Sequence, residues 1–272
     1  MTVPLKLAGV IGFPIAHSRS PRLHGHWLCR HGINGHYVPL QIAAQDFDKC
    51  LINLPKMGFA GANVTIPHKE TALALADSVS PLARRIGAAN TLTFTDNGIE
   101  ADNTDAHGFT WNILDHAPQW VPRRVAVIGA GGASRAVIAA LQDRGATEIW
   151  LTNRSPARAA QLAAEFGVTA VAWAERDAML DGCDTLINAT SLGMNGQPPL
   201  ELSLQALPAG AVVNDLVYTP LDTPLLAAAR ARGNIAIDGL GMLLHQAAPG
   251  FARWFGVTPT VDEDLRQAVL GA

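Results

Sequence analysis

Short apolar runs alternate with amphipathic stretches along most of the chain, which is the pattern of a mixed α/β protein. In the N-terminal part, three apolar runs predict strands at 7–11, 37–40 and 62–65. Periodic stretches predict helices at 21–31, 45–57 and 69–76. Ser20 is the expected N-cap of the first helix, with Pro21 at its first position and Gly32 at its end.

A turn signal closes this part of the chain. The sequence Asp96-Asn97-Gly98 lies between two short β-rich runs, 91–94 and 99–101. Asn-Gly flanked by such runs is typical of a hairpin. The N-terminal part is therefore expected to form a complete α/β unit.

A second series of buried strands begins near Arg124. We expect its strands at 124–128, 148–152, 169–172, 185–188, 211–214 and 235–237. Helices are expected from a glycine turn to Arg144, from Ser155 to Phe166, and over 242–255. Alternation of strand and helix predicts a parallel, doubly wound sheet, in which ligands lie outside the carboxyl ends of the strands.

Glycine and proline mark the ends of these helices. Gly145 and Gly167 follow the first two helices and are expected to end them. Pro249-Gly250 interrupts the last one, which predicts a kink or a division into two shorter helices.

Composition narrows the class of protein. The chain has 272 residues, which favours two domains, and 49% hydrophobic against 16% charged residues indicates a globular protein. The net charge of −3, without a basic run, argues against a nucleic-acid partner. No apolar run approaches the ~18–20 residues of a membrane span, and no secretory leader pattern opens the chain.

Cysteine and histidine usage adds little chemistry. Cys29, Cys50 and Cys183 are far apart and without metal-ligand spacing, so we expect a reducing, cytoplasmic location and no metal. His24 and His26 are two residues apart on a predicted helix and would point to different sides. These two, His17 and His68 are interpreted as structural or surface residues.

One lysine and one aspartate stand out among small polar residues. Lys69 ends the segment Asn63-Val64-Thr65-Ile66-Pro67-His68-Lys69, and Asp105 ends Asp102-Asn103-Thr104-Asp105. Lys69 could pass a proton, and Asp105 could hold and charge-tune the lysine. A solvated lysine is the ordinary alternative, although a cation in the first turn of a helix opposes the helix dipole.

A glycine turn follows the first buried strand of the second series. It comprises Gly129, Ala130, Gly131, Gly132, Ala133 and Ser134. Its glycines permit a tight turn and let the backbone approach a pyrophosphate, while the helix N-terminus offers free N–H groups. Ser134 departs from the third glycine of the usual pattern. We expect a dinucleotide site here, against the alternative of a bare strand-to-helix turn.

The residues that select the coenzyme are expected at the end of the second strand of this series, 148–152, where an NAD site usually has a carboxylate. This chain has Asn153 and Arg154 there, and Arg158 one helical turn later. A guanidinium can pair with a 2′-phosphate. We therefore predict NADP, against the alternative of two solvated arginines.

Seven short sequence motifs occur in order along nearly the whole chain, at 12–21, 63–69, 87–91, 103–105, 188–191, 218–220 and 239–242. This set resembles the shikimate dehydrogenase family. The resemblance implies an N-terminal α/β substrate-binding catalytic domain, 1–106 with 240–272, and a Rossmann-type NADP domain, 107–239. It also implies reversible reduction of 3-dehydroshikimate to shikimate by NADPH, in the biosynthesis of chorismate and the aromatic amino acids. The sequence leaves monomer and homodimer both open.

The resemblance assigns roles to individual residues. Lys69 and Asp105 are the expected catalytic pair. Ser18 and Ser20 would bind the substrate carboxylate, and the remaining substrate contacts, shared with Asp105, would come from Asn63, Thr65, Asn90, Tyr218 and Gln246. The nicotinamide end would lie against Thr190, Leu216, Gly239 and Met242, although many family members have Met at the position of Leu216.

Two alternatives stay open. One is a quinate or dual quinate/shikimate dehydrogenase, whose members often use NAD and differ near the carboxylate site; the serine pair and the two arginines favour shikimate with NADP. The other is a non-catalytic NADP-binding regulator, which would not need Lys69 and Asp105.

Overall fold

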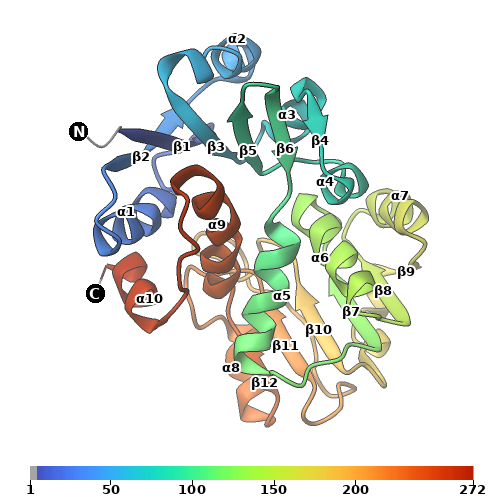
Figure 1. Cartoon of the computed structure of the whole chain (residues 1–272). Coiled ribbons are helices and arrows are strands. Elements are labelled where there is room, and N and C mark those ends of the chain that lie inside the picture. Colours follow the sequence, from blue (N-terminus) through green and yellow to red (C-terminus); the bar gives the residue numbers. More distant parts are fainter. Residues whose placement is uncertain (1–4, 272) are drawn as a thin grey trace. The chain divides into compact units, whose positions relative to one another are not determined.

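The computed structural model describes residues 5–271, which form two compact units, each around a six-stranded sheet (Figure 1). The first unit contains the chain up to Thr104 and again from Leu244 onward, and the second runs from Asp105 to Leu243. The domain bounds expected from the sequence stay a prediction. None of the helices in the described range is long and apolar enough to span a membrane.

The sheet of the first unit is mixed, with strand order β2-β1-β3-β5-β6-β4. Its strands are β1 (Lys6–Gly12), β2 (Gly35–Gln41), β3 (Phe59–Val64), β4 (Ser78–Val79), β5 (Thr91–Thr95) and β6 (Gly98–Asp102). β1 pairs in parallel with β2 and β3, whereas β5 runs antiparallel to β3 and β6. The predicted hairpin is therefore confirmed as β5–β6.

Helices supply the apolar cover of this sheet. They are α1 (Ser20–Arg30), α2 (Phe47–Leu51), α3 (Lys69–Leu75), α4 (Pro81–Ile86), α9 (Leu240–Phe255), which begins in the second unit, and α10 (Glu263–Leu270), with 3-10 turns η1 (Ala44–Asp46) and η2 (Pro55–Met57). One core packs Phe47 and Leu51 of α2 against Ile11 and Leu92. Another packs Trp27 of α1 against Phe251 of α9.

Two local predictions were wrong in this unit, and a third was wrong in part. Ser20 is the first residue of α1, and the N-cap is Arg19. The predicted helix 45–57 is divided into η1, α2 and η2, and α2 ends at Leu51 because Pro55 lacks the N–H that would continue the helix. α9 continues through Pro249 as one helix, so the division into two helices is wrong, whereas the kink stays a prediction. Its apolar face stays buried on both sides of the proline, and this packing outweighs the lost hydrogen bond.

The sheet of the second unit is entirely parallel, with order β12-β11-β10-β7-β8-β9. Its strands are β7 (Arg124–Ile128), β8 (Glu148–Thr152), β9 (Thr169–Val171), β10 (Thr185–Asn188), β11 (Val212–Asp215) and β12 (Ile235–Ile237). The predicted parallel, doubly wound sheet is confirmed.

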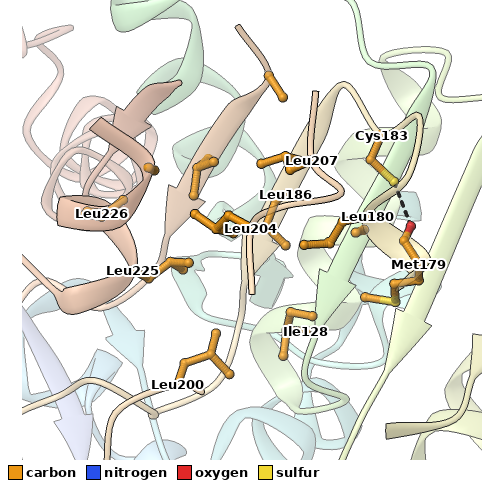
Figure 2. Packing of buried hydrophobic residues seen from close by; sticks show 14 of the residues in the cluster. Ile128, Met179, Leu180, Cys183, Leu186, Leu200, Leu204, Leu207, Leu225 and Leu226 are labelled. Atoms are coloured by element: carbon orange, nitrogen blue, oxygen red, sulfur yellow. Dashed lines mark hydrogen bonds between the residues drawn. The ribbon is translucent and has the colours of Figure 1, made fainter. Parts of the chain in front are cut away.

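Both faces of this sheet are covered. The helices are α5 (Asp105–His116), α6 (Gly132–Asp143), α7 (Pro156–Phe166) and α8 (Pro224–Ala231), with 3-10 turns η3 (Trp173–Glu175) and η4 (Ala178–Leu180). Figure 2 shows one core cluster of this unit, to which Ile128 of β7, Leu186 of β10 and Leu225 and Leu226 of α8 belong. Cover on both faces explains why strands β7, β10 and β11 are buried along nearly their whole length.

Candidate active site

In the first unit, a buried amide at the end of β3 organises a polar network. Asn63 Nδ2 donates to the backbone oxygen of Asn90 at 3.1 Å and to Thr91 Oγ1 at 3.2 Å. Asn63 Oδ1 accepts from the hydroxyl of Tyr37 at 2.7 Å. This places Asn63 beside Asn90 because β3 and β5 are paired, with Asn63 opposite Thr91.

Asn90 extends the network to two further segments. Its Oδ1 accepts from the backbone N–H of Thr104 at 2.8 Å, and its Nδ2 donates to Gln246 Oε1 at 3.3 Å. Three residues predicted to bind substrate, Asn63, Asn90 and Gln246, are thus brought together. The same network holds Thr104, the residue immediately before Asp105.

The end of β6 is anchored as well. Asp102 accepts hydrogen bonds from Ser80 Oγ at 2.6 Å and from the guanidinium of Arg253 at 2.5 Å. Burial opposes ionisation of Asp102, but these donors and the backbone N–H of Asn103 outweigh it and lower the pKa of its carboxyl. Asn103 Nδ2 in turn donates to the backbone oxygen of Ala88 at 2.9 Å.

The two predicted catalytic residues both open helices. Lys69 begins α3 in the first unit, and its backbone oxygen accepts from the N–H of Ala89 at 2.9 Å. Asp105 begins α5 and is the first residue of the second unit. Their pairing stays a prediction.

The predicted carboxylate site lies where α1 begins. The backbone N–H of Ser20 donates to Ser18 Oγ at 3.3 Å, so the two serines share one turn. The predicted substrate residue Thr65 follows β3, and a Cβ added at Gly12 would come within 2.5 Å of its Cγ2. Gly12 therefore lets the end of β1 and the segment after β3 approach closely.

Sequence reasoning missed a buried aromatic pair beneath these residues. The rings of His24 and Tyr37 stack with centroids 3.8 Å apart. Burial lowers the pKa of His24 to about 3, against the opposing effect of Asn63. Burial likewise raises the pKa of Tyr37, against the opposing effect of Ser20. Both side chains are therefore neutral at pH 7.

The second unit contains a pocket of about 250 Å³ at the carboxyl ends of its strands. Seven predicted coenzyme residues line it: Gly129, Ala130, Gly131, Asn153, Arg154, Arg158 and Thr190. Sequence reasoning missed Trp173, Ala189, Ser191 and Leu192. Ala189, Ser191 and Leu192 follow β10, whose carboxyl end was a usable signal, whereas the irregular segment around Trp173 gave none.

The glycine turn fits a closely approaching ligand. Gly129 has a φ of +109°, and a Cβ there would lie 2.8 Å from Thr190 Cγ2. Ser134 is buried and donates from Oγ to the backbone oxygen of Gly129 at 2.7 Å, which explains a serine at the third position of the motif. Gly132 and Ala133 form the first turn of α6, where N–H groups lack partners within the helix.

Basic side chains complete one wall of the pocket. Arg154 and Arg158 are exposed there, and among residues 5–271 no carboxylate forms an ion pair with either. Asn153 Oδ1 accepts from the N–H of Ala130 at 3.3 Å, which ties this wall to the glycine turn. The donor set therefore fits a dinucleotide with an additional phosphate.

Seven predicted site residues of the second unit lie outside the lining of this pocket: Asp105, Gly132, Ala133, Leu216, Tyr218, Gly239 and Met242. Leu216 and Gly239 nevertheless approach closely, since a Cβ at Gly239 would lie 2.1 Å from the backbone oxygen of Leu216. Met242 belongs to α9, and Tyr218 follows β11.

Histidines and carboxylates do not gather into a metal centre in the described chain. His68 is buried, with Nε2 2.7 Å from the backbone oxygen of Ile42 and its ring stacked on Phe47. Its contacts agree with the structural interpretation.

Fold and site together define the class: an α/β protein with a Rossmann-type unit that presents a dinucleotide pocket, as nicotinamide-dependent oxidoreductases do. Three family models match the chain in order. They are the shikimate dehydrogenase substrate binding domain at residues 10–92, shikimate / quinate 5-dehydrogenase at 114–194, and the shikimate 5'-dehydrogenase C-terminal domain at 239–270.

Individual proteins agree with these matches. The chain is 60% identical to shikimate dehydrogenase (NADP(+)) of Paracoccus denitrificans over 97% of its own length and 95% of the relative's. It resembles the structure of shikimate 5-dehydrogenase from Thermus thermophilus in complex with NADP(H) and shikimate, with 37% identity, a TM-score of 0.88, and 98% and 99% of the two chains covered. A quinate dehydrogenase from Corynebacterium glutamicum in complex with NAD gives 31% identity, a TM-score of 0.91 and the same coverage. The chain belongs to the shikimate dehydrogenase family.

Proposed function

We propose that this chain is an NADP-dependent shikimate dehydrogenase, which reversibly reduces 3-dehydroshikimate to shikimate with NADPH in aromatic amino acid biosynthesis. The main support is the pocket that combines the glycine turn with Arg154 and Arg158. The relative from Thermus thermophilus, crystallised with NADP(H) and shikimate, supports both ligands.

The two units have separate roles in this proposal. The first unit binds the substrate through the Asn63–Asn90–Gln246 network and Thr65, and Tyr218 of the second unit adds a contact. Ser18 and Ser20, at the start of α1, hold its carboxylate, since hydroxyls and free helix N–H groups suit an anion. The second unit binds NADP, with Leu216, Gly239 and Met242 toward the nicotinamide.

Lys69 and Asp105 carry the proton chemistry in this mechanism. The bound coenzyme supplies hydride to the ketone carbon, or accepts it in the reverse direction. As charge develops on the substrate oxygen, the Lys69 ammonium stabilises it and donates a proton. Asp105 orients that ammonium and bonds a neighbouring hydroxyl. In the reverse direction the neutral Lys69 amine accepts the hydroxyl proton.

The cellular setting is part of the same proposal. We place the enzyme in the cytoplasm, as a monomer or homodimer, acting on a small molecule and without a nucleic-acid or membrane partner. The cysteines Cys29, Cys50 and Cys183 are free, in keeping with a reducing compartment.

A four-way assay tests the proposal. The purified protein is given shikimate or quinate, each with NADP⁺ or NAD⁺, and formation of the reduced coenzyme is followed by absorbance. We expect the highest kcat/KM with shikimate and NADP⁺. The fold also resembles a quinate dehydrogenase in complex with NAD, so the pair of quinate and NAD⁺ is the most informative competitor. A preference for that pair would contradict the proposal. Binding of NADP(H) without turnover of either substrate would favour a regulator.

A further inference from the structure

A fully buried amide, Asn188, ends β10 beneath the loop that lines the coenzyme pocket. Its Nδ2 donates to the backbone oxygen of Leu192 at 3.1 Å and to Asp215 Oδ1 at 2.9 Å. Its Oδ1 accepts from the N–H of Thr190 at 3.1 Å and from Thr190 Oγ1 at 2.7 Å. Both donors and both acceptor positions of the amide are used, so it has one satisfied orientation.

Asp215 holds this amide from the neighbouring strand. It lies opposite Asn188 at the end of β11 and is buried. Besides Asn188, it accepts from the N–H of Val217 at 3.0 Å and from Thr223 Oγ1 at 2.7 Å. Thr223 also caps α8 by accepting from the N–H of Leu226 at 3.3 Å. Asp215 therefore joins the loop after β11 and the start of α8 to Asn188.

The loop fixed by Asn188 sets one wall of the pocket. Ala189 and Thr190 stand so close to the glycine turn that a Cβ on Gly129 would lie 2.9 Å from the oxygen of Ala189 and 2.8 Å from Thr190 Cγ2. Leu192 completes the same wall. Because the loop already packs against the turn, a small displacement changes the space left for a dinucleotide.

We propose that Asn188 and Asp215 are a positioning pair for NADP(H): neither is in the pocket lining, and together they fix the 189–192 loop against the glycine turn. This inference rests on the proposed function, since that function supplies the identity of the ligand. The role is geometric and does not depend on the charge of Asp215. An amide at position 215 keeps one oxygen for Asn188 and Val217, and its N–H can donate to the rotatable hydroxyl of Thr223.

The test measures NADPH affinity by fluorescence titration of the purified full-length protein. Asn188→Ala should raise the Kd for NADPH roughly 10–100-fold, because several bonds that order the loop are lost together. The matched control is Asn234→Ala. Asn234 is a buried amide of the same unit, and its Nδ2 donates to the backbone oxygens of Pro208 and Ala211 at 3.0 and 3.2 Å. It precedes β12, at the amino end of the strands, so the control should leave the Kd within about 2-fold.

Variants at position 215 separate positioning from general loss of stability. Asp215→Ala should weaken NADPH binding, whereas Asp215→Asn should restore most of the affinity. The Asn188→Ala/Asp215→Ala double variant should bind NADPH about as weakly as the weaker single variant, because both changes disable one assembly. If Asn188→Ala does not fold, the comparison of Asp215→Ala with Asp215→Asn decides alone.

Two outcomes overturn the inference. One is a folded Asn188→Ala protein with the Kd of the Asn234→Ala control. The other is equal NADPH affinity in Asp215→Ala and Asp215→Asn. Neither depends on turnover, so the inference can fail while wild-type protein oxidises shikimate, or hold while the proposed substrate proves wrong.

Discussion

At the scale of single residues, the proposed mechanism depends most on Lys69, the proton donor. Lys69→Ala should lower kcat by roughly 10²–10⁴-fold with little change in the KM for shikimate, because a general acid acts in the transition state. The measurement is steady-state oxidation of shikimate with NADP⁺.

A second lysine of the same unit provides the control for this prediction. Lys56 is exposed and bonds only locally, to Asn53 at 3.3 Å, so Lys56→Ala should keep the wild-type kcat. Near-wild-type turnover by the Lys69→Ala protein would remove Lys69 from the mechanism.

Tyr37 matters to the substrate through Asn63. Its hydroxyl is the donor to Asn63 Oδ1, at 2.7 Å, and both groups are buried. Tyr37→Phe keeps the ring stacked on His24 but leaves that oxygen without its donor. We expect the KM for shikimate to rise roughly 3–10-fold, with the KM for NADP⁺ unchanged, since one neutral hydrogen bond is lost.

A double-mutant cycle checks that Tyr37 acts through this amide. In an Asn63→Ala background, Tyr37→Phe should no longer change the KM for shikimate. An undiminished effect in that background would show that Tyr37 acts by another route.

Residue-level reasoning found the polar groups but not their supports. Lys69, Asn63 and the glycine turn stand out in the sequence because their residue types suit proton transfer or close backbone approach. Tyr37 and Asn188 do not, since each sits in a strand whose pattern predicts only burial. Their hydrogen-bond partners lie up to 27 residues away, a relation that local sequence does not contain.

At the scale of elements, the second unit was the easier to predict. Strands β7, β8, β10 and β12 have the bounds expected from the sequence, because in a parallel sheet covered on both faces each strand is a continuous apolar run between turn signals. The glycine at the end of α7, Gly167, adopts a φ of +67° and ends that helix as expected.

Helices α4, α5, α8 and α10 and strand β4 were missed, and three of these elements have weak patterns. α5 contains Gly108 and the buried polar Asn112, which interrupt its apolar periodicity. α8 spans only eight residues, although its Thr223 cap and Pro224 were a usable start signal. β4 has two residues, too few for any period.

The turn from β8 into α7 carries the prediction on coenzyme choice. Arg154→Ala should raise the KM for NADP⁺ about 10-fold or more and leave the KM for NAD⁺ within about 2-fold, because only NADP⁺ has a 2′-phosphate for the guanidinium. The measurement is shikimate oxidation with each coenzyme. Arg135→Ala removes the same charge from the same unit, at a guanidinium already paired with Glu165, and should change neither KM. Parallel losses with both coenzymes in the Arg154 variant would contradict the 2′-phosphate role.

At the scale of the whole molecule, the chain leaves its first unit after Thr104 and returns to it at Leu244. The core of that unit is therefore closed by residues far apart in sequence. Trp254 of α9 donates to the backbone oxygen of Leu92 at 2.9 Å, and Trp27 of α1 donates to that of Thr260 at 3.0 Å. The C-terminal segment therefore contributes directly to the packing of the first unit.

His24 lies in the core where α1 packs against α9, and its burial makes the stability of the first unit sensitive to acid. The ring is fully buried, stacked on Tyr37 and bordered by Trp27, Phe251 and Trp254. Burial lowers its pKa from 6.5 to about 3, so between these values the unfolded chain binds a proton that the folded protein excludes. Its contribution to stability is complete above about pH 6.5 and falls as the pH is lowered toward 3.

Replacing this ring with one that does not titrate should flatten the response. Lowering the pH from 7 to 5 should reduce the free energy of unfolding by about 2 kcal/mol through His24. This follows because pH 5 lies about 1.5 units below the unfolded pKa, and each pH unit corresponds to ~1.4 kcal/mol. His24→Phe keeps an aromatic ring against Tyr37 but removes the ionisable group. Urea unfolding at both pH values should therefore show a loss about 2 kcal/mol smaller in the variant than in the wild type. Because each protein is compared with itself at the two pH values, a constant change in stability caused by the substitution cancels. Equal losses in the two proteins would mean that His24 is not the group that couples this core to pH.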